Sequence, residues 1–93
     1  MSDDPQITQL RQQISETDRA IVDALNERLR LVARMKSYKE SVGIDFLDPE
    51  REAQLLQDLM RANAGPLSTD GLKELFDTVL ALTKREVQQG EAG

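Results

Sequence analysis

Apolar residues recur every three or four positions along most of the chain, which is the spacing that places them on one face of an α-helix. The pattern predicts a first helix from about Pro5 to Val42, a second that begins at Asp48-Pro49, and a third that begins near Ser68. Gly43 suits the left-handed exit of the first helix, and Asp48 suits the N-cap of the second. The expected fold class is therefore all-α, with three helices of which the first is very long.

The first helix is too long for a domain of this size. Its roughly 36 residues span about 50 Å, whereas a compact domain of 93 residues is about 30 Å across. The two shorter helices cannot cover such a stripe, so a long helix of a second copy is expected to lie along it. The sequence predicts one domain over residues 1–93, with residues 1–5 and 89–93 disordered, that forms a homodimer.

Composition removes several classes of chemistry. The chain has no Cys and no His, which excludes thiol chemistry, disulfides, most zinc sites and imidazole as a general base. We therefore expect no cofactor and no metal. The net charge of −5 argues against a nucleic-acid surface. No stretch is long or apolar enough to cross a membrane and no signal peptide is visible, so the expected location is the cytoplasm.

Charged residues interrupt the apolar seam of the first helix. At alternating steps of three and four, the seam reads Arg11, Ile14, Asp18, Ile21, Leu25, Arg28, Val32, Met35 and Lys39. Buried charge without a partner costs several kcal/mol, so each of these side chains is expected to have an ionic partner or a ligand. Arg28 and Lys39 lie within about 20° on one face and about 16 Å apart, close enough to hold one small ligand between them. Arg11 is about 26 Å from Arg28, so it reaches that ligand only from an antiparallel second copy.

A simpler interpretation of these cations is that they pair with acidic neighbours or extend to solvent at the helix edge. The second helix adds Arg51 and Glu52 in its first turn, where the carboxylate suits the helix dipole and the cation does not. The third helix adds Thr83, whose hydroxyl could simply bond to the carbonyl one turn back. Together, several cations, one carboxylate and one hydroxyl suit a small dicarboxylate that carries a hydroxyl group.

The pattern resembles the all-helical (AroQ-type) chorismate mutases over nearly the whole chain. The first helix carries the resemblance through Leu10-Arg11, Ile14, Asp18, Ile21, Leu25, Glu27-Arg28, Val32, Lys36 and Lys39. The run Asp48-Pro49-Glu50-Arg51-Glu52 is similar to the start of their second helix, and Leu75-Phe76 followed by Thr83 to their third. The resemblance implies an intertwined homodimer with two equivalent sites. Each would convert chorismate to prephenate by a pericyclic rearrangement, in phenylalanine and tyrosine biosynthesis.

The resemblance also implies roles for single residues. Arg28 and Arg11 of the partner subunit would hold the substrate carboxylates, with Arg51 in support. Lys39 would bond a carboxylate and the ether oxygen. The ring hydroxyl would be bound by Glu52 and the backbone at Asp48. The expected catalytic residues are Lys39, Arg28 and Glu52.

Two positions on the third helix depart from the family pattern or match it loosely. Thr83 stands where the family often has a carboxylate-contacting Ser. Val87 stands where it usually has Gln or Glu as a second donor to the ether oxygen. Either the last turn is irregular and Glu86 or Gln88 serves instead, or the site lacks this donor and is slower. The second case is compatible with activation by a partner enzyme of the shikimate pathway.

Other functions fit the same pattern. Isochorismate-pyruvate lyases and aminodeoxychorismate mutases share the scaffold and similar cation clamps. A non-catalytic regulatory helical module is the alternative from a different class. The complete set of Arg11, Arg28, Lys39, Arg51 and Glu52 favours an enzyme, because a structural coiled coil has apolar residues on its seam.

Overall fold

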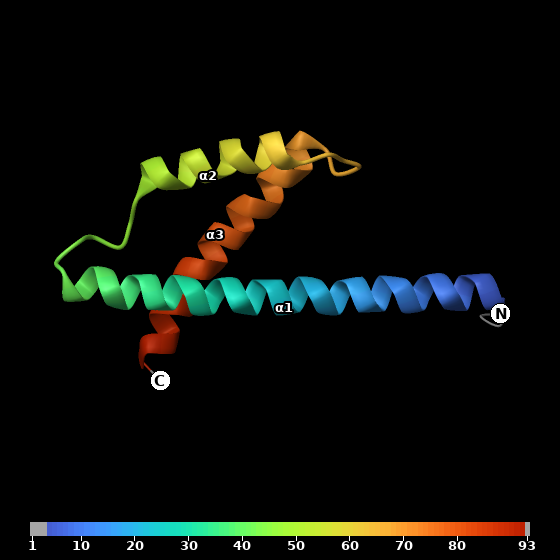
Figure 1. The fold of residues 1–93 in the computed structure, drawn as a ribbon, viewed down its shortest axis with the longest axis horizontal. Coiled ribbons are helices and arrows are strands. Elements are labelled where there is room, and N and C mark those ends of the chain that lie inside the picture. Colours follow the sequence, from blue (N-terminus) through green and yellow to red (C-terminus); the bar gives the residue numbers. More distant parts are fainter. Residues whose placement is uncertain (1–3, 93) are drawn as a thin grey trace. The chain divides into compact units, whose positions relative to one another are not determined.

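The computed structural model describes residues 4–92, with side chains described for residues 4–88. Over this range the chain forms three α-helices and no strand (Figure 1). They are α1 (Pro5–Ser41), α2 (Pro49–Ala62) and α3 (Thr69–Ala92). The predicted all-α class is confirmed, and the helices begin within a residue of the predicted starts.

The chain divides into two compact units, Met1–Leu31 and Val32–Gly93. The first unit carries the N-terminal part of α1, and the second carries the end of α1 together with α2 and α3. The expectation of one domain over residues 1–93 stays a prediction. So does the expected disorder of the termini where it concerns residues 1–3 and 93, which lie outside the described residues. The backbone of residues 89–92 belongs to α3.

Helix α1 begins one residue after Asp4, inside the segment expected to be disordered. The Asp4 carboxylate accepts hydrogen bonds from the backbone N–H groups of Gln6, at 2.8 Å, and of Ile7, at 3.2 Å. Pro5 occupies the first helical position, where an N–H would have no partner within the helix. A capping carboxylate and a proline therefore order this end of the chain.

Helix α1 ends in a Schellman motif built on Gly43. The N–H of Ile44 donates to the carbonyl of Lys39 at 2.8 Å, and the N–H of Gly43 donates to that of Glu40 at 3.4 Å. Gly43 has a φ of 74°, in the left-handed region that glycine adopts without strain. The predicted exit at Gly43 is confirmed, and it turns the chain into the connection that leads to α2.

The second and third helices begin with capping side chains. The Asp48 carboxylate accepts from the Arg51 N–H at 3.1 Å, and Pro49 is the first residue of α2, as predicted. The Ser68 hydroxyl accepts from the Gly71 N–H at 3.0 Å at the start of α3. Each cap satisfies a backbone donor that the helix itself cannot satisfy.

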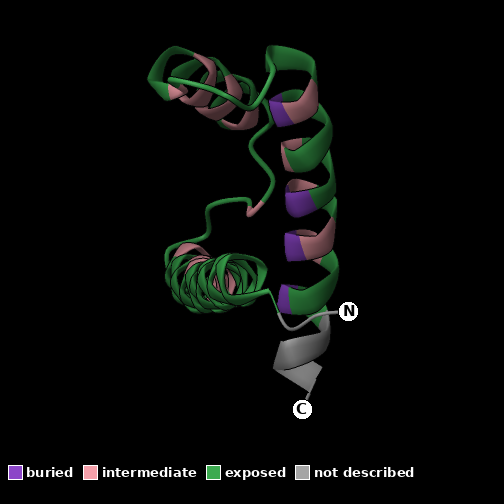
Figure 2. Cartoon of the chain, turned by 90° about the vertical axis from the view of Figure 1, so that its right-hand side faces the viewer, coloured by how far each residue is buried: buried purple, intermediate pink, exposed green. Residues whose placement is uncertain are grey.

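Helices α2 and α3 pack against each other in the second unit. The buried residues of α3 lie on one of its faces, as Figure 2 shows, and they are Leu72, Val79, Thr83 and Val87. The half-buried residues of α2 also share one face, at steps of three and four, namely Glu52, Leu55, Leu56, Leu59 and Met60. The α2 face thus begins with a carboxylate at its N-terminal end and continues with apolar residues.

Helix α1 has no buried residue. In the first unit its apolar stripe is exposed to solvent, at Ile7, Leu10, Ile14, Ile21, Val22 and Leu31. An amphipathic helix normally covers such a stripe with another element. The exposed stripe is consistent with the predicted homodimer, which stays a prediction.

None of the helices, over the residues that were described, has both the length and the apolar character that crossing a bilayer requires.

The Schellman motif leads to a first prediction. Gly43→Ala should lower the free energy of unfolding by about 1–2 kcal/mol, because an L-residue is strained in the left-handed region. A Cβ at this position meets no atom within 4 Å, so the loss is a backbone effect. Urea unfolding at one fixed protein concentration measures it. Gly43→Asn is the matched control and should lose less, since Asn tolerates this region. Equal stability of Gly43→Ala and the wild type would contradict the prediction.

Candidate functional site

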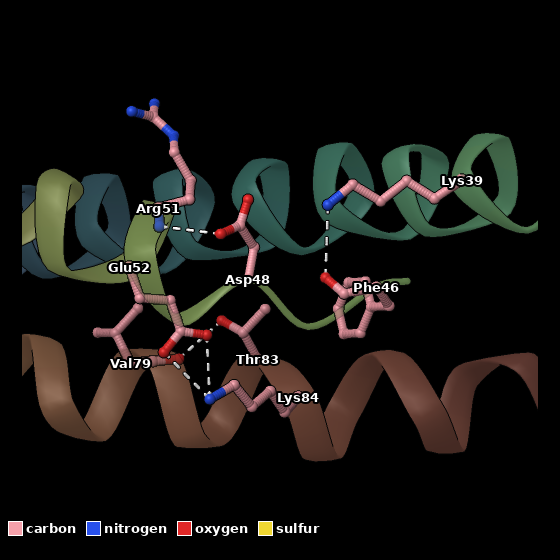
Figure 3. Close-up of polar contacts among 8 residues, drawn as sticks. All are labelled: Lys39, Phe46, Asp48, Arg51, Glu52, Val79, Thr83 and Lys84. Atoms are coloured by element: carbon pink, nitrogen blue, oxygen red, sulfur yellow. Dashed lines mark hydrogen bonds and ion pairs between the residues drawn. The ribbon is translucent and has the colours of Figure 1, made fainter. Parts of the chain in front are cut away.

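Lys39 lies at the end of α1 with its ammonium group held by a neutral partner. The Nζ atom donates to the backbone carbonyl of Phe46 at 3.4 Å, in a part-buried position (Figure 3). The neighbouring Glu40 pairs instead with Lys36, at 3.0 Å. A carbonyl orients an ammonium group without cancelling its charge, so Lys39 remains a cation that can attract an anion.

Phe46 is fixed by a second lysine as well. The Nζ atom of Lys36 lies 5.8 Å from the centroid of the Phe46 ring, within the range of a cation–π contact. The connection between α1 and α2 is therefore tied to α1 at Phe46 through its carbonyl and its ring. These two contacts position the Phe46 carbonyl oxygen beside the Nζ atom of Lys39.

Three of the predicted residues meet at the N-terminus of α2. The Asp48 side chain caps the helix through the Arg51 N–H, and the Asp48 carbonyl accepts from the Glu52 N–H at 3.1 Å. A carbonyl oxygen has two lone pairs, so that of Asp48 can accept a further bond. The exposed Arg51 side chain projects away from the Asp48 carboxylate in Figure 3.

Glu52 forms an ion pair with Lys84 of α3. The Lys84 Nζ lies 3.1 Å from Oε1 and 3.0 Å from Oε2 of Glu52, although the residues are 32 positions apart in the sequence. The Lys84 side chain is 39% exposed and that of Glu52 is 31% exposed. The pair joins α2 to α3 at the N-terminal end of the α2 contact face (Figure 3).

The Thr83 hydroxyl is used within its own helix. It donates to the Val79 carbonyl at 2.7 Å, and the side chain is 6% exposed. This is the simpler of the two interpretations that the sequence allowed. Donation to a substrate carboxylate would require the hydroxyl to leave this bond, and that role stays a prediction.

Val87 is 4% exposed, whereas its neighbours Glu86 and Gln88 are exposed. Helix α3 continues regularly through these residues. Of the two alternatives that the sequence left open, the structure therefore favours a regular last turn, because the backbone keeps its helical geometry and turns the flanking side chains about 100° away from that of Val87. The position that faces the interior carries an apolar side chain.

Arg11 and Arg28 belong to the first unit, and the other predicted residues belong to the second. Arg11 is exposed and Arg28 is half-buried. Glu27, the acidic residue next to Arg28 in the sequence, pairs with Arg30 at 3.1 Å. Within the second unit, the contacts join Asp48 to Arg51 and Glu52. Lys39 and Thr83 bond instead to the carbonyls of Phe46 and Val79.

Two contributors to this region were not predicted from the sequence, Lys84 and Phe46. The sequence does contain a signal for Lys84. Glu52 has the helical spacing of the apolar α2 face, and a carboxylate on a face that packs against another helix is expected to pair with a cation of that helix. Phe46 acts through its backbone carbonyl, which every residue has. No side-chain pattern could have identified it.

Comparison with known proteins relates most of the chain to one family. Residues 10–88 match the sequence model of the family described as chorismate mutase type II. A solved chain, the form II structure of chorismate mutase from Thermus thermophilus, is 28% identical with a TM-score of 0.84. That match covers 89% of this chain and 94% of the solved chain.

Longer curated proteins match as well. A bifunctional chorismate mutase/prephenate dehydratase of Stutzerimonas stutzeri is 36% identical over 86 residues, covering 87% of this chain and 24% of that protein. The T-protein of Enterobacter agglomerans is 36% identical over 86 residues, covering 92% of this chain and 22% of that protein. The chain thus spans about a quarter of the length of these relatives. With the family match extending over most of its residues, this chain belongs to the chorismate mutase type II family.

Proposed function

We propose that this chain catalyses the pericyclic rearrangement of chorismate to prephenate. The observation that carries the proposal is the part-buried Lys39 ammonium group, which donates to the backbone carbonyl of Phe46, two residues before the Asp48 N-cap of α2. Family membership supports it, because the matched region includes these residues. The absence of His and Cys is no obstacle, since the reaction needs no nucleophile and no proton transfer.

The chemistry depends on conformation and charge. Chorismate must be held in a compact conformer that brings its two reacting carbon atoms together. As the carbon–oxygen bond breaks, negative charge develops on the ether oxygen, and a preorganised cation stabilises it. Lys39 is assigned this role, because the Phe46 carbonyl holds Nζ in place and leaves its charge uncompensated.

The ring hydroxyl needs acceptors, and the start of α2 offers two. The Asp48 carbonyl retains a lone pair after accepting from the Glu52 N–H. The Glu52 carboxylate has about four lone-pair sites, of which Lys84 uses a part. These two groups are assigned to the substrate hydroxyl.

The two substrate carboxylates need cations. Arg28 and Arg51 are assigned to them, together with Arg11 of the partner subunit. The exposed apolar stripe on the first unit supports a homodimer, because a second α1 would cover it. In that assembly each site takes one arginine from the other subunit.

Lys39→Ala should lower kcat by about a hundredfold or more, because it removes the cation at the ether oxygen. Prephenate formation from chorismate measures the change, and circular dichroism checks that the variant is helical. Lys73→Ala is the matched control, since it removes an exposed lysine from α3 and should leave turnover unchanged. Near-normal turnover of Lys39→Ala would overturn the assignment.

The same assay separates the alternative functions. Purified protein is given chorismate, isochorismate and the 4-amino analogue side by side, with and without the enzyme that opens the shikimate pathway. Preference for chorismate supports the proposal. Faster conversion of another substrate identifies a lyase or an aminodeoxychorismate mutase. No conversion under any condition favours the regulatory module.

Subunit mixing tests the position of Arg11. Arg11→Ala and Lys39→Ala chains, refolded together in equal amounts, should regain about a quarter of wild-type activity, since half of the random dimers would hold one intact site. Each variant refolded alone is the control and should stay nearly inactive. A mixture no more active than the separate variants would place Arg11 in its own subunit's site, or outside any site.

Val87→Gln should raise kcat about tenfold, because it supplies a second donor to the ether oxygen. It should also lower stability by about 1–3 kcal/mol, because an amide enters a buried position. Initial rates and urea unfolding measure the two effects. Val87→Leu is the control without a donor; an equal rise in that variant, or no rise in Val87→Gln, would contradict the role given to this position.

A further inference from the structure

The Glu52–Lys84 ion pair is the contact in which α3 directs a charged side chain to the predicted site residues of α2. Lys84 follows Thr83, whose hydroxyl donates to Val79, and precedes by three residues the apolar Val87. Neither neighbour supplies a cation to α2. The Lys84 ammonium spans both oxygens of Glu52, at 3.1 Å and 3.0 Å (Figure 3).

The charge of Glu52 is a difficulty for a site that binds a dianion. A free carboxylate repels the two substrate carboxylates, and the repulsion grows as water leaves the site. A carboxylate is nevertheless a strong acceptor for a hydroxyl group. A lysine on its far side resolves the conflict, since it cancels the charge and leaves lone pairs for the hydroxyl.

We propose that Lys84 is a positioning residue for substrate binding. It neutralises Glu52 and fixes the orientation of the carboxylate, so that Glu52 accepts the ring hydroxyl without repelling the dianion. This inference rests on the proposed function, and it assigns to Lys84 an effect that passes through Glu52 and not through direct contact with substrate.

A purely structural role for the pair predicts a different result. Both side chains are about a third exposed, and ion pairs of this kind contribute little to stability. If the pair only joined α2 to α3, its loss would shift Tm slightly and would leave the KM of the folded protein close to that of the wild type. A rise in KM that disappears in the Glu52→Gln background is therefore the decisive readout.

The experiment compares wild type, Lys84→Met, Glu52→Gln and the double variant in chorismate turnover. Lys84→Met should raise KM about tenfold with kcat little changed, because it weakens binding in the ground state and the transition state alike. In the Glu52→Gln background the same substitution should change kcat/KM by about twofold or less, since no charge is left to neutralise. Lys84→Arg should restore most of the lost kcat/KM.

Arg85→Met is the matched control. It removes one positive charge from the next position of α3, where the Arg85 side chain contacts the adjacent Glu86, and it should leave KM unchanged. Circular dichroism and Tm confirm that each variant is folded. Should Lys84→Met fail to fold, Lys84→Gln, which keeps the polar length without the charge, takes its place.

The possible results distinguish failure of the role proposed for Lys84 from failure of the proposed chorismate mutase activity. A wild-type protein that converts chorismate, with Lys84→Met equal to Arg85→Met in KM, overturns the inference alone. Equal losses from Lys84→Met in the wild-type and Glu52→Gln backgrounds also overturn it, because the effect would not pass through Glu52. A wild-type protein that converts no chorismate overturns the proposed function together with the inference.

Discussion

The packing of α2 against α3 determines most of what the second unit can do. Helix α2 has 14 residues and none is buried, and a helix of that length is marginal in water without a partner. The face that it turns inward carries Leu55, Leu56 and Leu59, and Glu52 lies on the same face one turn earlier. The contact that stabilises α2 therefore also brings a carboxylate to α3, where Lys84 receives it.

Lys39 and Lys84 differ in their partners, and this difference defines the electrostatics of the candidate site. Lys39 is bound to a carbonyl and keeps its full charge, whereas Lys84 is bound to a carboxylate whose charge it cancels. In a chain of net charge −5, an anion is attracted only where cations are left uncompensated. The arrangement keeps Lys39 attractive to a dianion and turns Glu52 into an acceptor with little net charge.

Assembly and catalysis are linked in the proposed dimer through α1. The exposed apolar side chains of the first unit are 42–59% exposed, so burial of what remains would contribute about 1 kcal/mol each and would favour covering by a second copy. Arg11 lies on the same stretch of helix as these residues. In the proposed dimer, the surface that would be covered by the second copy thus also carries a residue assigned to the partner's site, so that a separated subunit would be both less stable and incomplete.

The sequence by itself determined the features that depend on neighbouring residues. Helix starts at Pro49 and near Ser68, the cap at Asp48 and the exit at Gly43 follow from backbone hydrogen bonds between residues a few positions apart, and such local rules can be applied without a structure. Only the tertiary structure could decide the pairing of Glu52 with Lys84, because it depends on how two helices are rotated when they pack. The same holds for the partner of Lys39, a backbone carbonyl that carries no sequence signal. At Thr83 the sequence left a choice between a ligand and the helix backbone, and the structure placed the hydroxyl on Val79 because that carbonyl lies one turn away at 2.7 Å.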